Sequence, residues 1–178
     1  MSRERLLEEL AGYLPHNDVE RIMMVRMRRF VERNSDCFSP ALEAGHITGG
    51  AWILDRTRRY VLLTHHRKLD KWLHLGGHAD GETDGLAIAL REAREESGLI
   101  DVRALSDKIF DLDVHPIPAR GSQPAHDHYD LRYLLEADRE IPLIVSSESK
   151  ALAWAELAAI RAWTTEASIL RMADKSPQ

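Results

Sequence analysis

Glu92, Glu95 and Glu96 are the residues of this sequence best suited to chemistry, because their spacing can bring three carboxylates together. On an α-helix, residues three and four positions apart lie on the same face. The stretch that holds them follows Gly76-Gly77, which predicts a glycine-rich loop and then a short helix. Carboxylates that converge beside such a loop suit a hard divalent cation such as Mg²⁺. The cation would also offset the repulsion between these like charges, which costs an isolated helix about 0.2–0.5 kcal/mol per pair.

The helix itself needs a start, a stop and a face that anchors it. Thr83 or Asp84 can cap its first turn, and Gly98 can end it in the left-handed conformation. A set of apolar residues shares one side and is expected to pack on a sheet: Leu86, Ala89, Leu90 and Ala93. Ile88 is expected on the other side, with the carboxylates. One rigid helix would then be anchored by one face and present the glutamates from another.

The stretch from Gly76 to Leu99 resembles the Nudix box, the signature of the Nudix hydrolase superfamily. That pattern is Gly, five residues, Glu, seven residues, and then Arg-Glu-apolar-any-Glu-Glu-any-Gly-apolar. The residues that fit stand at the full spacing, with no insertion or deletion: Gly77, Arg91, Glu92, Ala93, Glu95, Glu96, Gly98 and Leu99. Two positions differ. Thr83 replaces the isolated Glu, between Glu82 and Asp84, and Leu75 stands where family members often have Pro.

The resemblance implies an α/β (α+β) fold of the Nudix type, an α/β/α sandwich with a mixed β-sheet. It assigns the metal to Glu92, Glu95, Glu96 and the backbone carbonyl of Gly76, and it assigns Arg91 to orienting the carboxylates. The implied cofactor is Mg²⁺, with Mn²⁺ as an alternative. The implied reaction is attack of water on a phosphorus of a diphosphate linkage, in a nucleoside diphosphate linked to another moiety.

Two other functions stay open from the same resemblance. A Nudix domain can act as a non-catalytic nucleotide-binding or regulatory module, although such a module has no need for the full set of Arg91 and the glutamates. A related fold can support isomerase chemistry, which would need a cysteine near the cleft. The single cysteine, Cys37, lies far upstream and is expected to be a small apolar core residue.

Residues outside the box are candidates for the remaining roles. Family members usually recruit one more carboxylate or base, and Glu148, in a serine-rich loop, is the first candidate, followed by Asp130. Trp72 could stack on a base of the substrate, and His78 or His128 could contact its phosphates. Several other histidines surround the expected cleft by sequence, so zinc binding and plain polar surface are both alternatives, although no cysteine partner is present.

The rest of the chain predicts a domain at residues 43–174 preceded by a helical extension at residues 1–36, packed on the domain. The extension has two helices, at 3–14 and from the Asn17 or Asp18 cap to about Asn34; the second carries an arginine-rich face, either solvated or facing an anionic substrate or partner. Strands are expected at 46–54, 60–64, 73–75, 107–115, 129–136 and 152–154. One helix is expected at 155–160, and a final helix begins after a cap at Thr164 or Thr165 and ends at about 173. Residues 119–126 read as a loop, and 141–145 as a loop or short strand.

The amino-acid composition limits the class of protein, its partners and its location. The 178 residues are 44% hydrophobic and 30% charged, with a formal net charge of −5, which suits an ordinary globular protein and gives no reason to expect a nucleic-acid polymer as partner. No apolar run approaches the ~20 residues of a membrane span, so no membrane partner is expected. One cysteine excludes an internal disulfide, and the charged N-terminus favours a cytoplasmic location. A homodimer is left open.

Overall fold

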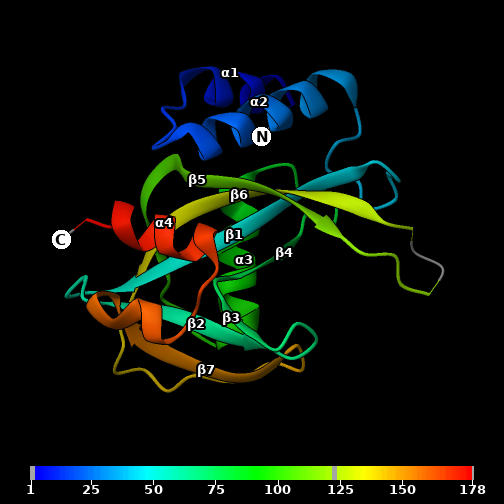
Figure 1. The fold of residues 1–178 in the computed structure, drawn as a ribbon. Helices are drawn as coiled ribbons and strands as arrows, with labels where there is room; N and C mark the ends of the chain where they lie inside the picture. The colour runs from blue at the N-terminus through cyan, green and yellow to red at the C-terminus, as the bar shows by residue number, and fades with distance from the viewer. Residues whose placement is uncertain (1–2, 122–123, 178) are drawn as a thin grey trace.

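A mixed β-sheet forms the centre of the computed structural model, which describes residues 3–121 and 124–177 (Figure 1). In chain order the elements are α1 (Arg3–Gly12), α2 (Asp18–Arg33), β1 (Gly45–Asp55), β2 (Tyr60–His66), β3 (Lys71–Leu73), β4 (Leu75–His78), α3 (Gly85–Ser97), β5 (Arg103–Ile117), β6 (His126–Ala137), β7 (Ser149–Glu156), the 3₁₀ helix η1 (Leu157–Ala162) and α4 (Ala167–Lys175). The predicted fold class, a mixed sheet between helices with two helices before it, is confirmed.

The strands follow the order β3-β2-β1-β6-β5, with β4 also pairing with β1 and β7 with β2. The long central pair, β1 and β6, is parallel, and the other pairs are antiparallel. In this register His46 lies opposite His128, and Thr48 lies between His78 and Asp130. Side chains two residues apart share a face of a strand. The register therefore gathers polar residues from three strands on one face of the sheet.

The two glycine pairs meet inside the sheet. Gly76 and Gly77 of β4 pair with Gly50 and Gly49 of β1. The prediction that Gly76 and Gly77 form a loop is therefore wrong, because they complete a strand and the loop begins at Ala79. Because successive residues of a strand face opposite sides, Gly49 and Gly77 leave a bare strip on one face of the sheet, and other groups can approach the backbone closely there.

Helix α3 uses that strip to pack against the sheet. A Cβ added to Gly49 would lie 2.6 Å from the Ile88 Cγ2 atom, so only glycine leaves room for this side chain. Ile88 is fully buried and, as predicted, shares its side of the helix with Glu92 and Glu96, but the prediction that this side differs from the one packed on the sheet is wrong. The predicted ends of the helix are confirmed: the Asp84 side chain accepts hydrogen bonds from the first turn, and Gly98 has a φ of 74°.

The opposite face of the sheet carries α4 and a buried network of charges. Arg132 donates to Asp130 at 2.7 Å and to Asp111 at 3.2 Å. Arg171 of α4 donates two further hydrogen bonds of 2.8 Å to Asp111. Asp111 is fully buried, so α4 is fixed to β5 and β6 by paired charges as well as by apolar contacts.

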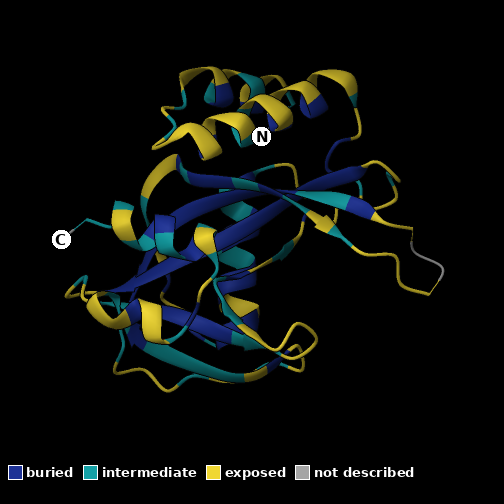
Figure 2. Cartoon of the chain, in the orientation of Figure 1, coloured by how far each residue is buried: buried dark blue, intermediate teal, exposed yellow. Residues whose placement is uncertain are grey.

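Helices α1 and α2 cover the β5 side of the sheet (Figure 1), with exposed outer faces and buried inner residues (Figure 2). The predicted cap at Asn17 is confirmed by its hydrogen bond from the backbone N–H of Glu20. The Glu20 side chain is fully buried and accepts hydrogen bonds from Tyr13 at 2.5 Å, from Lys175 at 2.7 Å and from the N–H of His16. One carboxylate thus joins α2 to α4.

Several predicted boundaries change. Strands β5 and β6 are longer than predicted, so His126 belongs to a strand and Pro116 lies inside one. Residues 155–160 form strand and 3₁₀ helix, residues 141–145 form no strand, and Glu166 takes the cap position of α4 that was predicted for Thr164 or Thr165. Part of the predicted loop, residues 122–123, lies outside the described residues. None of the described helices has both the length and the apolar content that crossing a membrane requires.

Candidate active site

Arg91 organises the charged end of α3. Its Nη1 atom lies 2.9 Å from Glu92 Oε1 and 3.1 Å from Glu95 Oε2, and its Nη2 atom donates a 2.5 Å hydrogen bond to the carbonyl of His78. The last contact joins the helix to the end of β4. Arg91 therefore holds two of the predicted carboxylates in a fixed position relative to the sheet.

The three glutamates differ in depth. Glu92 and Glu96 are 9% and 8% exposed, whereas the Glu95 side chain is 59% exposed. Glu96 accepts a 3.1 Å hydrogen bond from the backbone N–H of Gly76. The predicted metal-binding residues therefore lie together, with two carboxylates facing the sheet and one facing solvent.

Gly77 makes room for one of these carboxylates. A Cβ at this position would lie 2.7 Å from the carboxyl carbon of Glu92, a distance that no real side chain tolerates. Before the helix, the Glu82 carboxylate accepts hydrogen bonds from the N–H groups of Thr83 at 2.6 Å and Asp84 at 2.8 Å. Glu82 thus orders the loop in which Thr83 replaces the pattern's isolated Glu.

Burial dominates the electrostatics of the two inner carboxylates. Desolvation raises the pKa of Glu92 to about 7; the charge of Arg91 opposes the rise, and Glu95, Asp80 and Glu148 add to it. Desolvation likewise raises the pKa of Glu96 to about 8. The hydrogen bond from Gly76 lowers this pKa, and the charges of Glu92, Glu148 and Glu95 raise it further. Closely spaced, partly desolvated oxygen donors of one sign fit a hard divalent cation, which would relieve both costs.

Glu148 comes from a different part of the chain and still acts on this group. Its charge raises the pKa of both Glu92 and Glu96, so it lies within electrostatic range of them. Arg67 holds the backbone of this loop: its N–H donates to the Glu148 carbonyl at 2.9 Å, and its guanidinium donates to the carbonyls of Ser147 at 3.0 Å and Ser149 at 2.6 Å. Arg67 could not be singled out from the sequence, because a single basic residue in a loop shows no pattern.

Asp130, the second candidate base, is bound on several sides. It lies in the network on the α4 face, with Arg132, with His74 at 3.0 Å and with the Thr48 hydroxyl at 3.0 Å. Burial by itself would raise the pKa of Asp130, but the charge of Arg132 and the contact with His74 hold it well below its usual range. This arrangement is that of a structural ion pair.

Trp72 is not brought together with His78 and His128. It lies on β3, where its ring stacks on His65 at a centroid distance of 4.9 Å and meets the edge of Trp163 at 4.9 Å. His78 and His128, by contrast, lie on the strands that flank β1, with ring centroids 5.2 Å apart. His46 of β1 lies between them, and the sequence analysis did not single it out, because its proximity depends on strand register.

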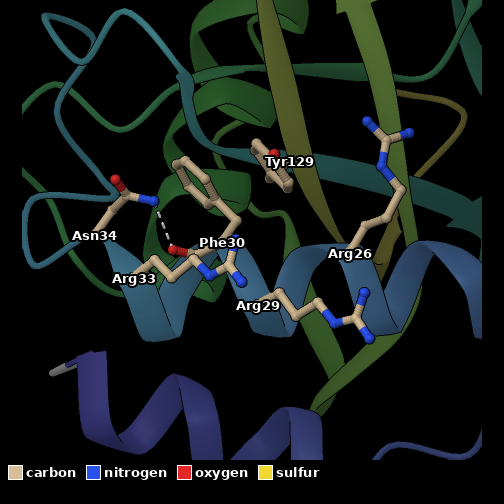
Figure 3. A pocket seen from close by; sticks show the side chains of 6 residues that line it. All are labelled: Arg26, Arg29, Phe30, Arg33, Asn34 and Tyr129. Atoms are coloured by element: carbon tan, nitrogen blue, oxygen red, sulfur yellow. Dashed lines mark hydrogen bonds between the residues drawn. The ribbon is translucent and has the colours of Figure 1, made fainter.

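The arginine-rich face of α2 lines a separate pocket of about 280 Å³ (Figure 3), formed by Arg26, Arg29, Phe30, Arg33, Asn34 and Tyr129. The rings of Phe30 and Tyr129 stack at 3.8 Å, and Arg26 bonds to Asp127 at 3.0 Å. No glutamate of α3 lines this pocket. The arginines therefore lie at a distinct surface from the carboxylate site.

Comparisons with known proteins agree with this geometry. A model of the NUDIX domain matches residues 45–173, and a search of curated proteins found no match. A C. elegans Ap4A hydrolase in a binary complex has a similar structure, with a TM-score of 0.58 and 19% identity over 72% of this chain and 93% of that one. A NUDIX-family hydrolase from Clostridium perfringens has a TM-score of 0.55 and 24% identity, over 73% of this chain and 95% of that one.

The E. coli dihydroneopterin triphosphate pyrophosphohydrolase gives a TM-score of 0.57 and 17% identity, over 72% of this chain and 92% of that one. At these identities the structural likeness shows a shared fold. The family model covers well over half of the chain and includes all three glutamates of α3. The chain therefore belongs to the Nudix family, with its NUDIX domain at residues 45–173.

Proposed function

We propose that this protein is a metal-dependent Nudix hydrolase that cleaves a diphosphate linkage in a nucleoside diphosphate joined to another moiety. The observation that carries the proposal is the arrangement of Glu92 and Glu96 of α3 against β4, where Gly77 makes room for Glu92, Gly76 bonds to Glu96 and Arg91 pairs with Glu92. Glu148, which precedes β7, acts on both carboxylates through its charge. Two similar structures are named for Ap4A hydrolysis and for a pyrophosphohydrolase of dihydroneopterin triphosphate, which favours a substrate with a phosphate chain.

Each residue of the site has a role in this proposal. Glu92, Glu95, Glu96 and the carbonyl of Gly76 would hold the cation. When bound, Mg²⁺, or Mn²⁺ in its place, would lower the pKa of a bound water and neutralise charge on the phosphates.

Glu148 would accept the proton of the attacking water as its oxygen forms a bond to phosphorus and the bond from that phosphorus to the bridging oxygen breaks. The leaving phosphate carries the bridging oxygen away. Arg91 would keep the carboxylates in register with β4, through its contacts with Glu92, Glu95 and the carbonyl of His78. The domain limits 1–36 and 43–174, a cytoplasmic location and a homodimer stay predictions.

The test is turnover of a panel of nucleoside diphosphate derivatives with Mg²⁺, measured as released monophosphate or phosphate. Glu95→Gln removes one charge at the exposed edge of the site, and we expect it to lower kcat/KM at least about 100-fold, the effect of losing a few kcal/mol of stabilisation of the transition state. Glu140→Gln is the matched control, because this carboxylate is 84% exposed and pairs only loosely, at 3.8 Å, with Arg139.

Equal activity in Glu95→Gln would refute the assignment of the metal site. Tight binding of one compound by the wild-type protein, with no metal-dependent turnover of any compound, would instead favour the non-catalytic binding module.

A further inference from the structure

A cluster of histidines lies on the face of the sheet that α3 does not cover. His46 of β1, His78 of β4 and His128 of β6 each offer a ring nitrogen within 4.8 Å of the other two. The strand register produces the cluster, since His46 lies opposite His128 and two residues from Thr48, the partner of His78. Three imidazoles from three neighbouring strands thus point to one place.

This place is separate from the carboxylates. Gly77 faces Glu92 of α3, so the side chain of its strand neighbour His78 points to the other face of the sheet. The same alternation holds on β1. Gly49 faces Ile88 of α3, and His46 precedes it by an odd number of residues, so the His46 side chain points to the opposite face. The histidine cluster and the glutamates are therefore on opposite sides of β4.

Three ring nitrogens of the cluster are buried without a hydrogen-bond partner among the described residues. Among the described residues, no hydrogen-bond partner lies near either ring nitrogen of His46 or near Nε2 of His128, and all three atoms are buried. A buried polar atom without a partner costs about 1–3 kcal/mol. Such atoms in a native structure call for a ligand that satisfies them.

The cluster also favours the neutral imidazole, the form that binds metals. Burial lowers the pKa of His46 to about 4, with the charges of His78 and His126 adding to the effect. Burial likewise lowers the pKa of His128 to about 3, together with neighbouring His46 and His78. Neutral rings attract a phosphate poorly, whereas their free lone pairs suit a borderline cation.

We propose that His46, His78 and His128 form a binding site for a transition-metal ion of the Zn²⁺ class, distinct from the cation site of the glutamates. Three histidines and an open fourth position are a recurrent ligand set for zinc. His78 is the exposed member, so the ion can enter from solvent there.

A fourth nitrogen is available beside the three. The ring of His126 stacks on that of His46 at 5.1 Å, and its Nε2 atom is buried without a partner among the described residues. Its Nδ1 atom lies 2.9 Å from the carbonyl of Pro124. A ligating histidine commonly donates its second N–H to a backbone carbonyl, which leaves the other nitrogen free to bind the metal.

The geometry requires only local movement. Zinc–nitrogen bonds of about 2.0–2.1 Å in a tetrahedron place the ligand nitrogens roughly 3.3 Å apart. The nitrogens here lie within 4.8 Å of one another, so closing the site needs shifts of the order of an ångström, which rotations of the histidine side chains can supply. The backbone register does not have to change.

The test uses the full chain without a polyhistidine tag. After chelator treatment and dialysis against Zn²⁺, we expect about one tightly bound ion per chain by elemental analysis, and X-ray absorption of the wild-type protein showing about three imidazole ligands. His46→Gln and His128→Gln should each weaken Zn²⁺ binding at least about tenfold, as loss of a ligand does. His16→Gln is the matched control, since this histidine is exposed and lies outside the cluster.

Glu96→Gln separates the two sites, because it should leave Zn²⁺ binding at the histidines unchanged. Zn²⁺ binding that survives His46→Gln and His128→Gln together, or that disappears in Glu96→Gln, would overturn the proposal. So would an absorption spectrum without imidazole ligands, which needs no variant. The inference does not depend on hydrolysis, since all of these measurements report the ion itself.

Discussion

The backbone of Gly77 lies directly against the carboxylate of Glu92: a Cβ on the glycine would lie 2.7 Å from the carboxyl carbon. This relationship joins the two ends of the Nudix box. A glycine at this position of the pattern lets the Glu92 carboxylate lie against the strand, where any side chain would displace it. The fixed spacing between Gly77 and Glu92 in the sequence therefore reflects a direct contact between the two residues in the structure.

Gly77→Ala should displace Glu92 and leave the fold intact. The new methyl group pushes the proposed metal-binding carboxylate away from its position, and a displacement of about 1 Å typically costs about 10²-fold in rate. Gly12→Ala is the control, because nothing lies within 4 Å of the Cβ it would add. The measurement is kcat/KM beside the circular dichroism spectrum. Full activity in Gly77→Ala would show that Glu92 needs no fixed position.

Arg67→Ala should lower kcat by about 10–100-fold, the usual effect of losing a group that orients a functional residue. The reason is the three hydrogen bonds by which Arg67 fixes the loop of Glu148. Lys68→Ala, which removes the neighbouring exposed cation, should have little effect.

A double variant distinguishes this role from general destabilisation. If Arg67 acts through Glu148, then Arg67→Ala combined with Glu148→Gln should be no slower than Glu148→Gln alone. Losses that multiply in the double variant would contradict the positioning role.

Glu20→Gln should destabilise the protein by about 3–5 kcal/mol, the range found when one partner of a buried ion pair is removed. Glu20 is fully buried and is bonded to Lys175 and Tyr13. Glu32→Gln on the same helix breaks only an exposed pair with Arg28 and should cost less than about 1 kcal/mol. Urea unfolding measures both. Equal effects would mean that α2 is not fixed through Glu20.

The protein should lose stability in acid through Asp111. Burial alone would raise its pKa, but hydrogen bonds from Arg171 and the charges of Arg132, Arg171 and Lys175 lower the pKa to about 2, from 3.8. Since the folded-state pKa is depressed, the stabilisation is complete above about pH 4 and is lost as the pH falls toward 2.

The free energy of unfolding, measured against pH, checks this window. In Asp111→Asn the decline between pH 4 and 2 should be smaller, while Asp174→Asn, at a carboxylate that is 60% exposed, should behave as the wild type. An unchanged decline in Asp111→Asn would assign acid sensitivity to other groups.

The sequence predicted the parts of the site that lie within one short stretch. Helical spacing alone brings Glu92, Glu95 and Glu96 together, and the cap at Asp84 and the stop at Gly98 follow from local chemistry. The packing of Ile88 and Glu92 on the sheet was not predicted, because it depends on the bare backbone of Gly49 and Gly77 in two strands.

Features that depend on strand register could not be predicted. The loop read from Gly76-Gly77 is a strand, because its glycines find partners on β1, far away in the sequence. The approach of His46 to His128 follows from the parallel pairing of β1 with β6, which no local pattern reveals. Arg67 likewise gains its role only when the chain returns with Glu148 some 80 residues later.

The most direct test of hydrolysis at phosphorus is turnover in ¹⁸O-labelled water with Mg²⁺, comparing the wild type with Glu96→Gln. The Gln variant is a fair comparison, because Gln has nearly the same shape and can still accept the hydrogen bond from Gly76. We predict one ¹⁸O atom in a phosphate product of the wild type, only with the metal, and a rate lowered at least about 100-fold in the variant. Label incorporation that is independent of metal, or equal in both proteins, would contradict the account.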